Sequence, residues 1–409
     1  MTAGRHAAGR RSPGSAILPA LLLLLAACTT LPETTPATGT VGGQQVAAGV
    51  DSPEAAYFMG RYLAGERGWS EVDARIDALY AAAVPGALPD SAELKRIADA
   101  FSVDFAAIYF AERVADVAAN RLLRRTYDAQ LERALADYRR AAPPRLLPEA
   151  ADYTFIGVPG YYYESHRESG ADLAEPRGAL EDAGLQPQLI LTDEAGAVEA
   201  NADLVTAALR RAARPDRKII VVSASKSGPE VALALSRLAP REARTIKAWI
   251  NIVGLLRGTP LADEILGDGP LSRYRSFVED DGLHSLVTGK RRDAFRRFRL
   301  RDGLLVVNYI GIPVTGTISE RARDSYIALR AYGPNDGLNL LADQIAPGSV
   351  TLADFGRDHY LAGDTLRPRT IALVNTTVAW LTRCAAPAGP PPSDPGATAD
   401  CGWAARQAP

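Results

Sequence analysis

Short β-rich runs alternate with helical segments from residue 148 onward, and this alternation limits the folds open to the 409-residue chain more than any other feature. Runs of β-branched and other apolar residues predict strands over residues 153–158, 188–191, 218–222, 247–253, 304–310 and 349–352. Apolar side chains at helical spacing predict helices over residues 199–211, 229–238 and 370–381. Because parallel strands need long crossover connections that are usually helices, we expect an α/β fold with a mostly parallel central sheet.

The segment before this region is expected to be helical. Ser52 followed by Pro53 marks a helix start, because proline suits the first helical turn. Residues 101–138 repeat apolar side chains three and four positions apart, which predicts a helix with one buried face. Prolines at 143–144 end the region. A helical N-terminal subdomain therefore precedes the α/β domain.

Composition divides the chain further. Residues 29–50 are rich in Thr, Gly, Pro and Ala without an apolar period, which predicts a flexible tether. The stretch 258–302 is polar, basic and irregular, as a cap-like insertion would be. The expected units are a signal peptide at 1–27, a tether at 28–50, a helical subdomain at 51–147, an α/β domain at 148–383 and a Pro/Gly-rich tail at 384–409.

A buried strand turns abruptly into a helix through small residues, Ser223-Ala224-Ser225-Lys226-Ser227-Gly228. This segment resembles the nucleophile elbow of the α/β-hydrolase superfamily, although serines replace both flanking glycines of the common Gly-x-Ser-x-Gly. The resemblance implies an α/β-hydrolase fold in which Ser225 is the nucleophile. The backbone N–H of Lys226 would then be one donor to the oxyanion.

The same segment also matches the S-x-x-K motif of penicillin-binding and β-lactamase enzymes, in which Ser223 would attack. That fold needs K-T-G and S-D-N companions, and neither occurs in the chain. A serine-rich turn without chemistry is the third interpretation. The choice among them depends on the partners of the serine.

The turn Pro334-Asn335-Asp336-Gly337 follows the predicted strand at 304–310. In α/β-hydrolases an acid emerges after a strand beyond the elbow, and bacterial lipases have a similar Asn-Asp-Gly, so the resemblance implies Asp336 as the acid. Asp324 and Asp343 are weaker alternatives, because both lie in segments that look helical.

The chain has four histidines, which leaves few candidates for a general base. His359 directly follows the last predicted strand, where the superfamily carries its histidine, and it comes after both Ser225 and Asp336. His6 would be removed with the signal peptide, His284 lies in the irregular insertion, and His166 precedes the elbow. The expected triad order is therefore Ser, Asp, His.

The second oxyanion donor should come from the loop after residues 153–158. Pro159 has no N–H, so Gly160 or Tyr161 is expected to donate. The tyrosines at 161–163, with His166, either line the substrate pocket or pack under the helical subdomain. The predicted reaction is hydrolysis of a small-molecule or lipid carboxylic ester, as in lipases and carboxylesterases, through an acyl-enzyme.

The N-terminus has the pattern of an export signal. Arg5, Arg10 and Arg11 precede an apolar run at 17–27, which is too short to span a bilayer. Leu25-Ala26-Ala27-Cys28 resembles the lipobox of bacterial lipoproteins, which implies cleavage before Cys28, acylation (palmitate among the chains) and attachment to the cell envelope. Thr29, rather than aspartate, after the cysteine favours the outer membrane. A simple signal peptide remains the alternative.

The remaining cysteines, Cys384 and Cys401, flank the Pro/Gly-rich tail, and an exported chain is expected to join them in a disulfide. Two unrelated thiols are the alternative. A net charge of −2 argues against a nucleic-acid binder. No metal-ligand spacing and no phosphate-binding glycine loop occurs, so no metal or cofactor is expected. The sequence carries no signal for the oligomeric state.

Two further interpretations stay open. A basic cluster in the insertion either contacts anionic lipid head groups or forms a solvated helix face: Lys290, Arg291, Arg292, Arg296, Arg297 and Arg299. A lipid-anchored envelope protein could also use a hydrolase fold for binding alone, because fold does not decide function.

Overall fold

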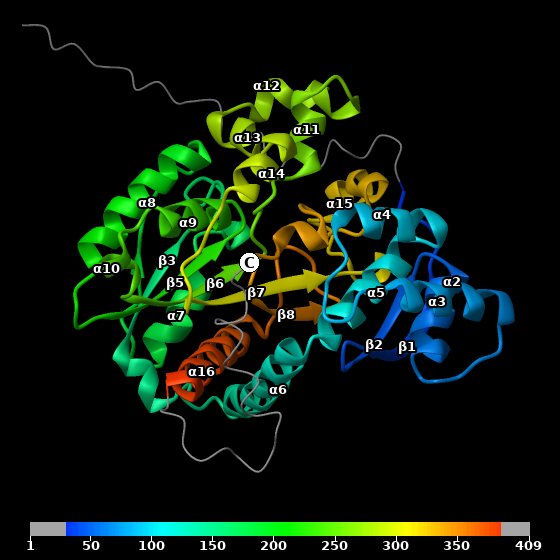
Figure 1. The fold of residues 1–409 in the computed structure, drawn as a ribbon, viewed down its shortest axis with the longest axis horizontal. Helices are drawn as coiled ribbons and strands as arrows, with labels where there is room; N and C mark the ends of the chain where they lie inside the picture. Colours follow the sequence, from blue (N-terminus) through cyan, green and yellow to red (C-terminus); the bar gives the residue numbers. More distant parts are fainter. Residues whose placement is uncertain (1–29, 386–409) are drawn as a thin grey trace, which may run out of the picture.

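A six-stranded parallel sheet lies at the centre of the computed structural model, which describes residues 30–385 (Figure 1). The strand order is β4-β3-β5-β6-β7-β8, and every neighbouring pair is parallel. The strands are β3 (Tyr153–Val158), β4 (Gln188–Leu189), β5 (Lys218–Ala224), β6 (Ile246–Ile252), β7 (Leu305–Ile312) and β8 (Val350–Phe355). Each predicted strand is present, and β4 at the sheet edge is shorter than predicted.

Helices cover both faces of this sheet (Figure 1). One face packs on α8 (Val198–Ala212) and α9 (Ser227–Ser236), near the short α10 (Pro240–Ala243). The other face packs on α6 (Ala118–Arg139), α7 (Ala174–Asp182) and α16 (Leu366–Ala385). Because the central strands are covered on both sides, their sequences are almost continuously apolar, and all eight residues of β7 are buried. The predicted α/β-hydrolase fold class is confirmed.

The helical N-terminal subdomain is also present. It contains α2 (Pro53–Tyr57), the π-helix η2 (Phe58–Tyr62), α3 (Ser70–Ala82), α4 (Ser91–Ala100) and α5 (Val103–Asp116). Ser52 caps α2 as the Ser-Pro pattern predicts, since its side chain accepts the Ala55 N–H. These helices share a core with the end of the sheet, where Ile310, Ile312 and Phe355 contribute.

The long helix expected over residues 101–138 is wrong, because Val117 has extended backbone (φ −69°, ψ 120°) and separates α5 from α6. The apolar spacing continues across this break, so periodicity alone could not locate it. The consequence is a change of partner: α5 packs in the N-terminal subdomain, whereas α6 packs against α16 and β8.

The tether expected over residues 28–50 is wrong for most of its length. Strands β1 (Thr35–Val41) and β2 (Gln44–Val50) form an antiparallel hairpin closed at Gly42 and Gly43, which have φ of +56° and +80°. Two glycines with positive φ are typical of a tight hairpin turn, a signal that the tether interpretation overlooked. Burial of Val41 and Val50 in the N-terminal core stabilises the hairpin.

The segment expected to be cap-like lies over the carboxyl ends of the strands (Figure 1). It contains α11 (Pro260–Leu266), η5 (Pro270–Tyr274), α12 (Arg275–Val278), α13 (Asp281–Ser285) and α14 (Thr288–Arg296). Its apolar side chains form a small core with Val198 of α8. The connections elsewhere contain η3 (Pro148–Asp152), η4 (Arg167–Ser169), η6 (Thr315–Thr317), α15 (Arg323–Leu329), η7 (Arg330–Tyr332) and η8 (Leu341–Gln344).

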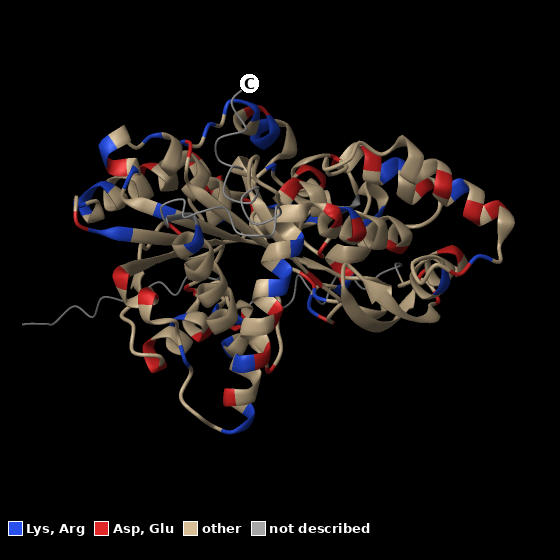
Figure 2. Cartoon of the chain, turned by 60° about the horizontal axis from the view of Figure 1, so that its bottom comes forward, with Lys and Arg blue, Asp and Glu red and all other residues tan. Residues whose placement is uncertain are grey.

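Charges of both signs are spread over the cartoon (Figure 2). Several residues of the basic cluster in the insertion pair with acidic side chains. Buried Arg291 and exposed Lys290 both pair with Glu199, and Arg292 lies 2.9 Å from Asp343. Arg296 pairs with Asp293. Lys290, Arg291 and Arg292 thus join the cap to the rest of the domain, which disfavours the lipid-binding interpretation for these three residues.

Several predictions concern the chain ends. The signal peptide, Cys28 and Cys401 lie outside the described residues, and Cys384 falls in the last turn of α16. Within residues 30–385, no helix has the length and apolar character needed to cross a bilayer.

Candidate active site

Ser225 occupies the turn between β5 and α9 and has φ +56°, a left-handed conformation that is costly for a side chain larger than glycine. Small neighbours make this turn possible. A Cβ added at Gly160 would lie 3.1 Å from the Ala224 carbonyl oxygen and 3.6 Å from Ser225 Cβ. A Cβ added at Gly228 would lie 2.8 Å from the Cα of Gly254. The backbone thus exposes the Ser225 hydroxyl at the carboxyl end of the sheet.

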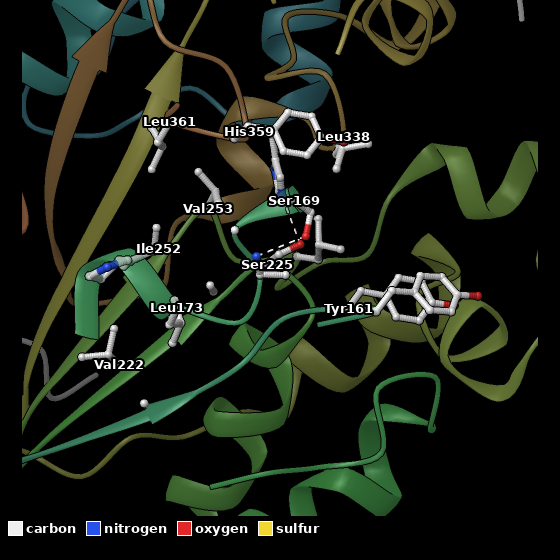
Figure 3. A pocket seen from close by; sticks show the side chains of 18 of the residues that line it. Tyr161, Ser169, Leu173, Val222, Ser225, Ile252, Val253, Leu338, His359 and Leu361 are labelled. Atoms are coloured by element: carbon white, nitrogen blue, oxygen red, sulfur yellow. Dashed lines mark hydrogen bonds between the residues drawn. The ribbon is translucent and has the colours of Figure 1, made fainter. Parts of the chain in front are cut away.

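The structure brings together the three residues that the sequence singled out. His359 Nε2 lies 3.0 Å from Ser225 Oγ, and His359 Nδ1 lies 2.7 Å from Asp336 Oδ2 (Figure 3 shows Ser225 and His359). Asp336 and His359 are both buried. This is the geometry that a nucleophile, a general base and an orienting acid require.

The loop that carries Asp336 is held by its own backbone. Asp336 Oδ1 accepts the N–H groups of Leu338 and Asn339, at 2.9 and 2.7 Å. The His359 N–H donates to the Asp336 carbonyl at 2.8 Å, so the two loops are joined directly. Gly337, with φ +100°, permits the turn that the Pro-Asn-Asp-Gly motif predicts.

The alternative acids and histidines lie elsewhere. Asp324 is in α15, and Asp343 in η8 pairs with Arg292. His284 pairs with Glu279 in the cap. His166 pairs with Glu168 and lines the cavity described below, as one of the two interpretations of this segment expects.

The contacts of Ser223 disfavour the S-x-x-K interpretation. Its buried hydroxyl accepts the indole N–H of Trp249 at 2.8 Å, from the neighbouring strand. The Lys226 ammonium is buried as well and lies 2.5 Å from Glu230 Oε1. The two groups thus have separate partners, Trp249 and Glu230, and the structure shows no hydrogen bond between them.

The N–H of Gly160 donates to the Ala171 carbonyl at 2.8 Å, which makes Gly160 wrong as an oxyanion donor in this conformation. Among the described residues, the Tyr161 and Lys226 N–H groups have no recorded backbone or side-chain acceptor. Gly160 still has a role, because a side chain there would strike the elbow. Lys226 and Tyr161 remain the predicted donors.

Asp280, in the cap, is a partner of this loop that the sequence analysis missed. It accepts hydrogen bonds from the hydroxyls of both Tyr161 and Tyr162, whose rings stack with centroids 4.2 Å apart. Burial, reinforced by these neighbours, raises the pKa of Tyr161 far above its usual value. The tyrosines therefore bind the loop after β3 to the cap, a relationship between residues 119 positions apart that no local pattern reveals.

A cavity of about 390 Å³ opens at Ser225 and His359. Its wall is mostly apolar and comes from the sheet, the cap, α7 and α16. Figure 3 shows part of this wall, with Leu173, Val222 and Ile252. Within residues 30–385, no group of three or more His, Cys, Asp or Glu side chains is arranged to hold a metal ion. The Ser-His-Asp chain lies at this wall, together with polar side chains that include His166, Tyr309 and Arg369.

Comparisons with known proteins give structural neighbours only. No family model matches the chain, and no curated protein matches its sequence. A metagenomic carboxyl esterase is 22% identical with a TM-score of 0.47, over 59% of this chain and 78% of its own. The mature Bacillus licheniformis lipase BlEst2 is 20% identical with a TM-score of 0.45, over 53% and 87%. Phospholipase PlaB from Legionella pneumophila is 17% identical with a TM-score of 0.36, over 47% and 45%. The assignment of the α/β-hydrolase fold therefore depends on the strand order and the elbow of this chain.

Proposed function

We propose that the protein is a serine hydrolase that cleaves carboxylic esters through an acyl-enzyme. The observation that carries the proposal is the hydrogen-bonded chain Ser225–His359–Asp336 at the wall of an apolar cavity. An ester fits this site better than a charged substrate, because the wall offers few partners for charge.

In the proposed reaction, Ser225 Oγ attacks the ester carbonyl carbon while His359 Nε2 takes the hydroxyl proton. The N–H groups of Lys226 and Tyr161 stabilise the oxyanion, and Asp336 stabilises the imidazolium. Collapse of the intermediate breaks the bond to the leaving alcohol, which receives the proton from His359. Water, activated by His359, then hydrolyses the acyl-enzyme and regenerates Ser225.

A fluorophosphonate probe followed by peptide mapping tests this proposal. We expect label on Ser225 in the mature protein, none in Ser225→Ala, little in His359→Ala and normal labelling in Ser223→Ala. The unlabelled protein should hydrolyse p-nitrophenyl butyrate, and labelling should abolish this activity. Label on Ser223 would favour the S-x-x-K mechanism, and a folded protein without label or hydrolysis would favour a binding protein.

The proposal includes attachment of the enzyme to the bacterial envelope through acylated Cys28, with the outer membrane as the expected site. The sequence pattern at residues 25–28 is its support. Metabolic labelling with a palmitate analogue, followed by membrane fractionation, tests it. Label should be present in the wild type and absent in Cys28→Ala. A wild-type protein without label would favour a simple signal peptide.

A further inference from the structure

The cavity extends from Ser225 in two directions. One part, the cap arm, lies under the insertion and is lined by Leu261, Ile265, Leu283 and Leu338. The other part, the core arm, lies between the sheet and helices α7 and α16 and is lined by Gly157, Leu173, Val222, Ile252, Thr370 and Leu373.

Two side chains of the central strands are incompletely buried beside the core arm. Val222 in β5 and Ile252 in β6 have strands on both sides, yet both are only partly buried, unlike most of their neighbours. In β3, the neighbouring position is Gly157, which contributes no side chain. Side chains normally fill the space between a sheet and the helices that cover it. The opening beneath Val222 and Ile252 is therefore a local gap in the packing.

The walls of the core arm suit a hydrocarbon chain. The arginines at its border, Arg177 and Arg369, pair with Glu181 and Asp354. Tyr309, which also lines the cavity, donates its hydroxyl to Asp354 at 2.8 Å. An apolar chain entering this arm would therefore meet aliphatic side chains and charges that already have partners.

The position of His359 distinguishes the two arms. Its Nε2 must reach the leaving oxygen, so the alcohol portion of an ester lies on the His359 side of Ser225. In Figure 3, His359 and Leu338 lie above Ser225, whereas Leu173 and Val222 lie below it. The acyl portion, on the opposite side of the carbonyl carbon, is thereby directed toward the core arm.

We infer that the core arm is the acyl-binding subsite, and that the substrates are esters of unbranched, medium- to long-chain fatty acids. This inference rests on the proposed function. It adds the identity of the acid and assigns each portion of the ester to one arm.

The test compares p-nitrophenyl butyrate, octanoate and laurate below their aggregation limits. Burial of each added methylene should raise kcat/KM by about two- to fourfold, so octanoate should exceed butyrate by at least about tenfold. Val222→Phe, which fills the core arm, should abolish most of this octanoate-to-butyrate ratio. Thr370→Phe fills the arm from α16 and should do the same, since Thr370 only donates back to Leu366.

Two variants serve as controls. Ile265→Phe narrows the cap arm and should leave the octanoate-to-butyrate ratio intact, whatever its effect on either rate. Leu204→Phe, on the exposed side of α8, should change neither rate.

The outcomes separate the two claims. If Ser225 is labelled and the ratio is near one, or if it falls in Ile265→Phe and not in the folded core-arm variants, the subsite assignment is overturned. If Ser225 is neither labelled nor required for hydrolysis, the proposed function itself fails and the subsite with it.

Discussion

Asp336 Oδ2 lies 2.7 Å from His359 Nδ1, while the other carboxylate oxygen of Asp336 accepts the N–H groups of Leu338 and Asn339. This arrangement determines how the amide of an asparagine would be oriented at position 336. In Asp336→Asn, the side-chain oxygen must stay with the two backbone donors, so the amide NH₂ would face His359 Nδ1.

We expect Asp336→Asn to lower kcat by about 10⁴-fold with little loss of stability. The NH₂ group would donate to Nδ1 and leave the proton on Nε2, where it prevents His359 from accepting the proton of Ser225. The measurement is kcat for p-nitrophenyl butyrate alongside thermal unfolding. A variant within tenfold of the wild-type rate would show that Asp336 is not the orienting acid.

The side chain of Gln44 binds β8, the last strand at one edge of the sheet. It donates to the Ala353 carbonyl at 3.1 Å and accepts the Phe355 N–H at 3.2 Å, both in β8. Gln44→Ala should lower the free energy of unfolding by about 1–3 kcal/mol, because the partly buried Phe355 N–H loses its acceptor, whereas the Ala353 carbonyl keeps the Arg124 guanidinium as a donor. Gln45→Ala is the matched control, since Gln45 is exposed and bonds only Thr40. If Gln44→Ala and Gln45→Ala lower the free energy of unfolding equally in urea, the contacts of Gln44 with β8 do not stabilise the fold.

Lys226 and Glu230 form a buried ion pair one turn from the nucleophile. Burial raises the pKa of the Glu230 carboxyl, and the charge of Lys226 opposes this rise. Lys226→Met should cost about 3–5 kcal/mol at pH 8, because it leaves a buried carboxylate without its cation. The double variant Lys226→Met/Glu230→Gln should recover much of this loss.

The Lys226→Met variant should also acquire a pH dependence. With its folded pKa raised further, Glu230 binds a proton more tightly in the folded than in the unfolded state, so the deficit should shrink as the pH falls from 8 toward 5. Denaturant unfolding across this range measures it. A deficit that is independent of pH would mean that Glu230 is already protonated or that solvent enters the site.

Asp104 links the N-terminal subdomain to η6 and α15, which follow β7, since it accepts the Thr315 N–H and the Tyr326 hydroxyl. Burial, followed by the nearby Asp51 carboxylate, raises the pKa of Asp104 to about 6, while Thr315 and Arg330 act in the opposite direction. The ordinary value in an unfolded chain is about 3.9. The folded state therefore holds this proton more tightly than the unfolded state does.

The contribution of Asp104 to stability should be fully present below pH about 4 and should be lost as the pH rises through about 6. Asp104→Asn removes this titration, although it also loses a hydrogen-bond acceptor. We expect the stability advantage of the wild type over Asp104→Asn to decrease between pH 4 and pH 7 in urea unfolding. An advantage that grows over this range would have the wrong sign for a raised pKa.

Features that depend on local chemistry could be predicted well. Strands β5 and β7 are β-branched runs that must be buried on both faces, and Ser225 needs small neighbours because its turn is strained. The candidate site followed from chain order: His359 is the histidine that comes after both Ser225 and Asp336. The contacts at 3.0 and 2.7 Å agree with that order.

Other features escaped prediction because their causes are distant in the chain. Composition predicted a tether where Val41 and Val50 instead find a core made by later helices. Periodicity continued through Val117, where the chain changes partners. Whether the Gly160 N–H was available depended on Ala171, which follows it in a loop without a recognisable pattern.

The α/β class and the elbow could be predicted from the sequence alone, because each follows from requirements within a short segment. The Ser, Asp and His candidates came from a resemblance that depends only on their order along the chain. Tertiary packing was needed to show that Asp280 of the cap binds the loop after β3 and that an unfilled space lies beneath Val222 and Ile252. Both depend on how closely separate elements approach, and that distance is set by the packing of the whole domain.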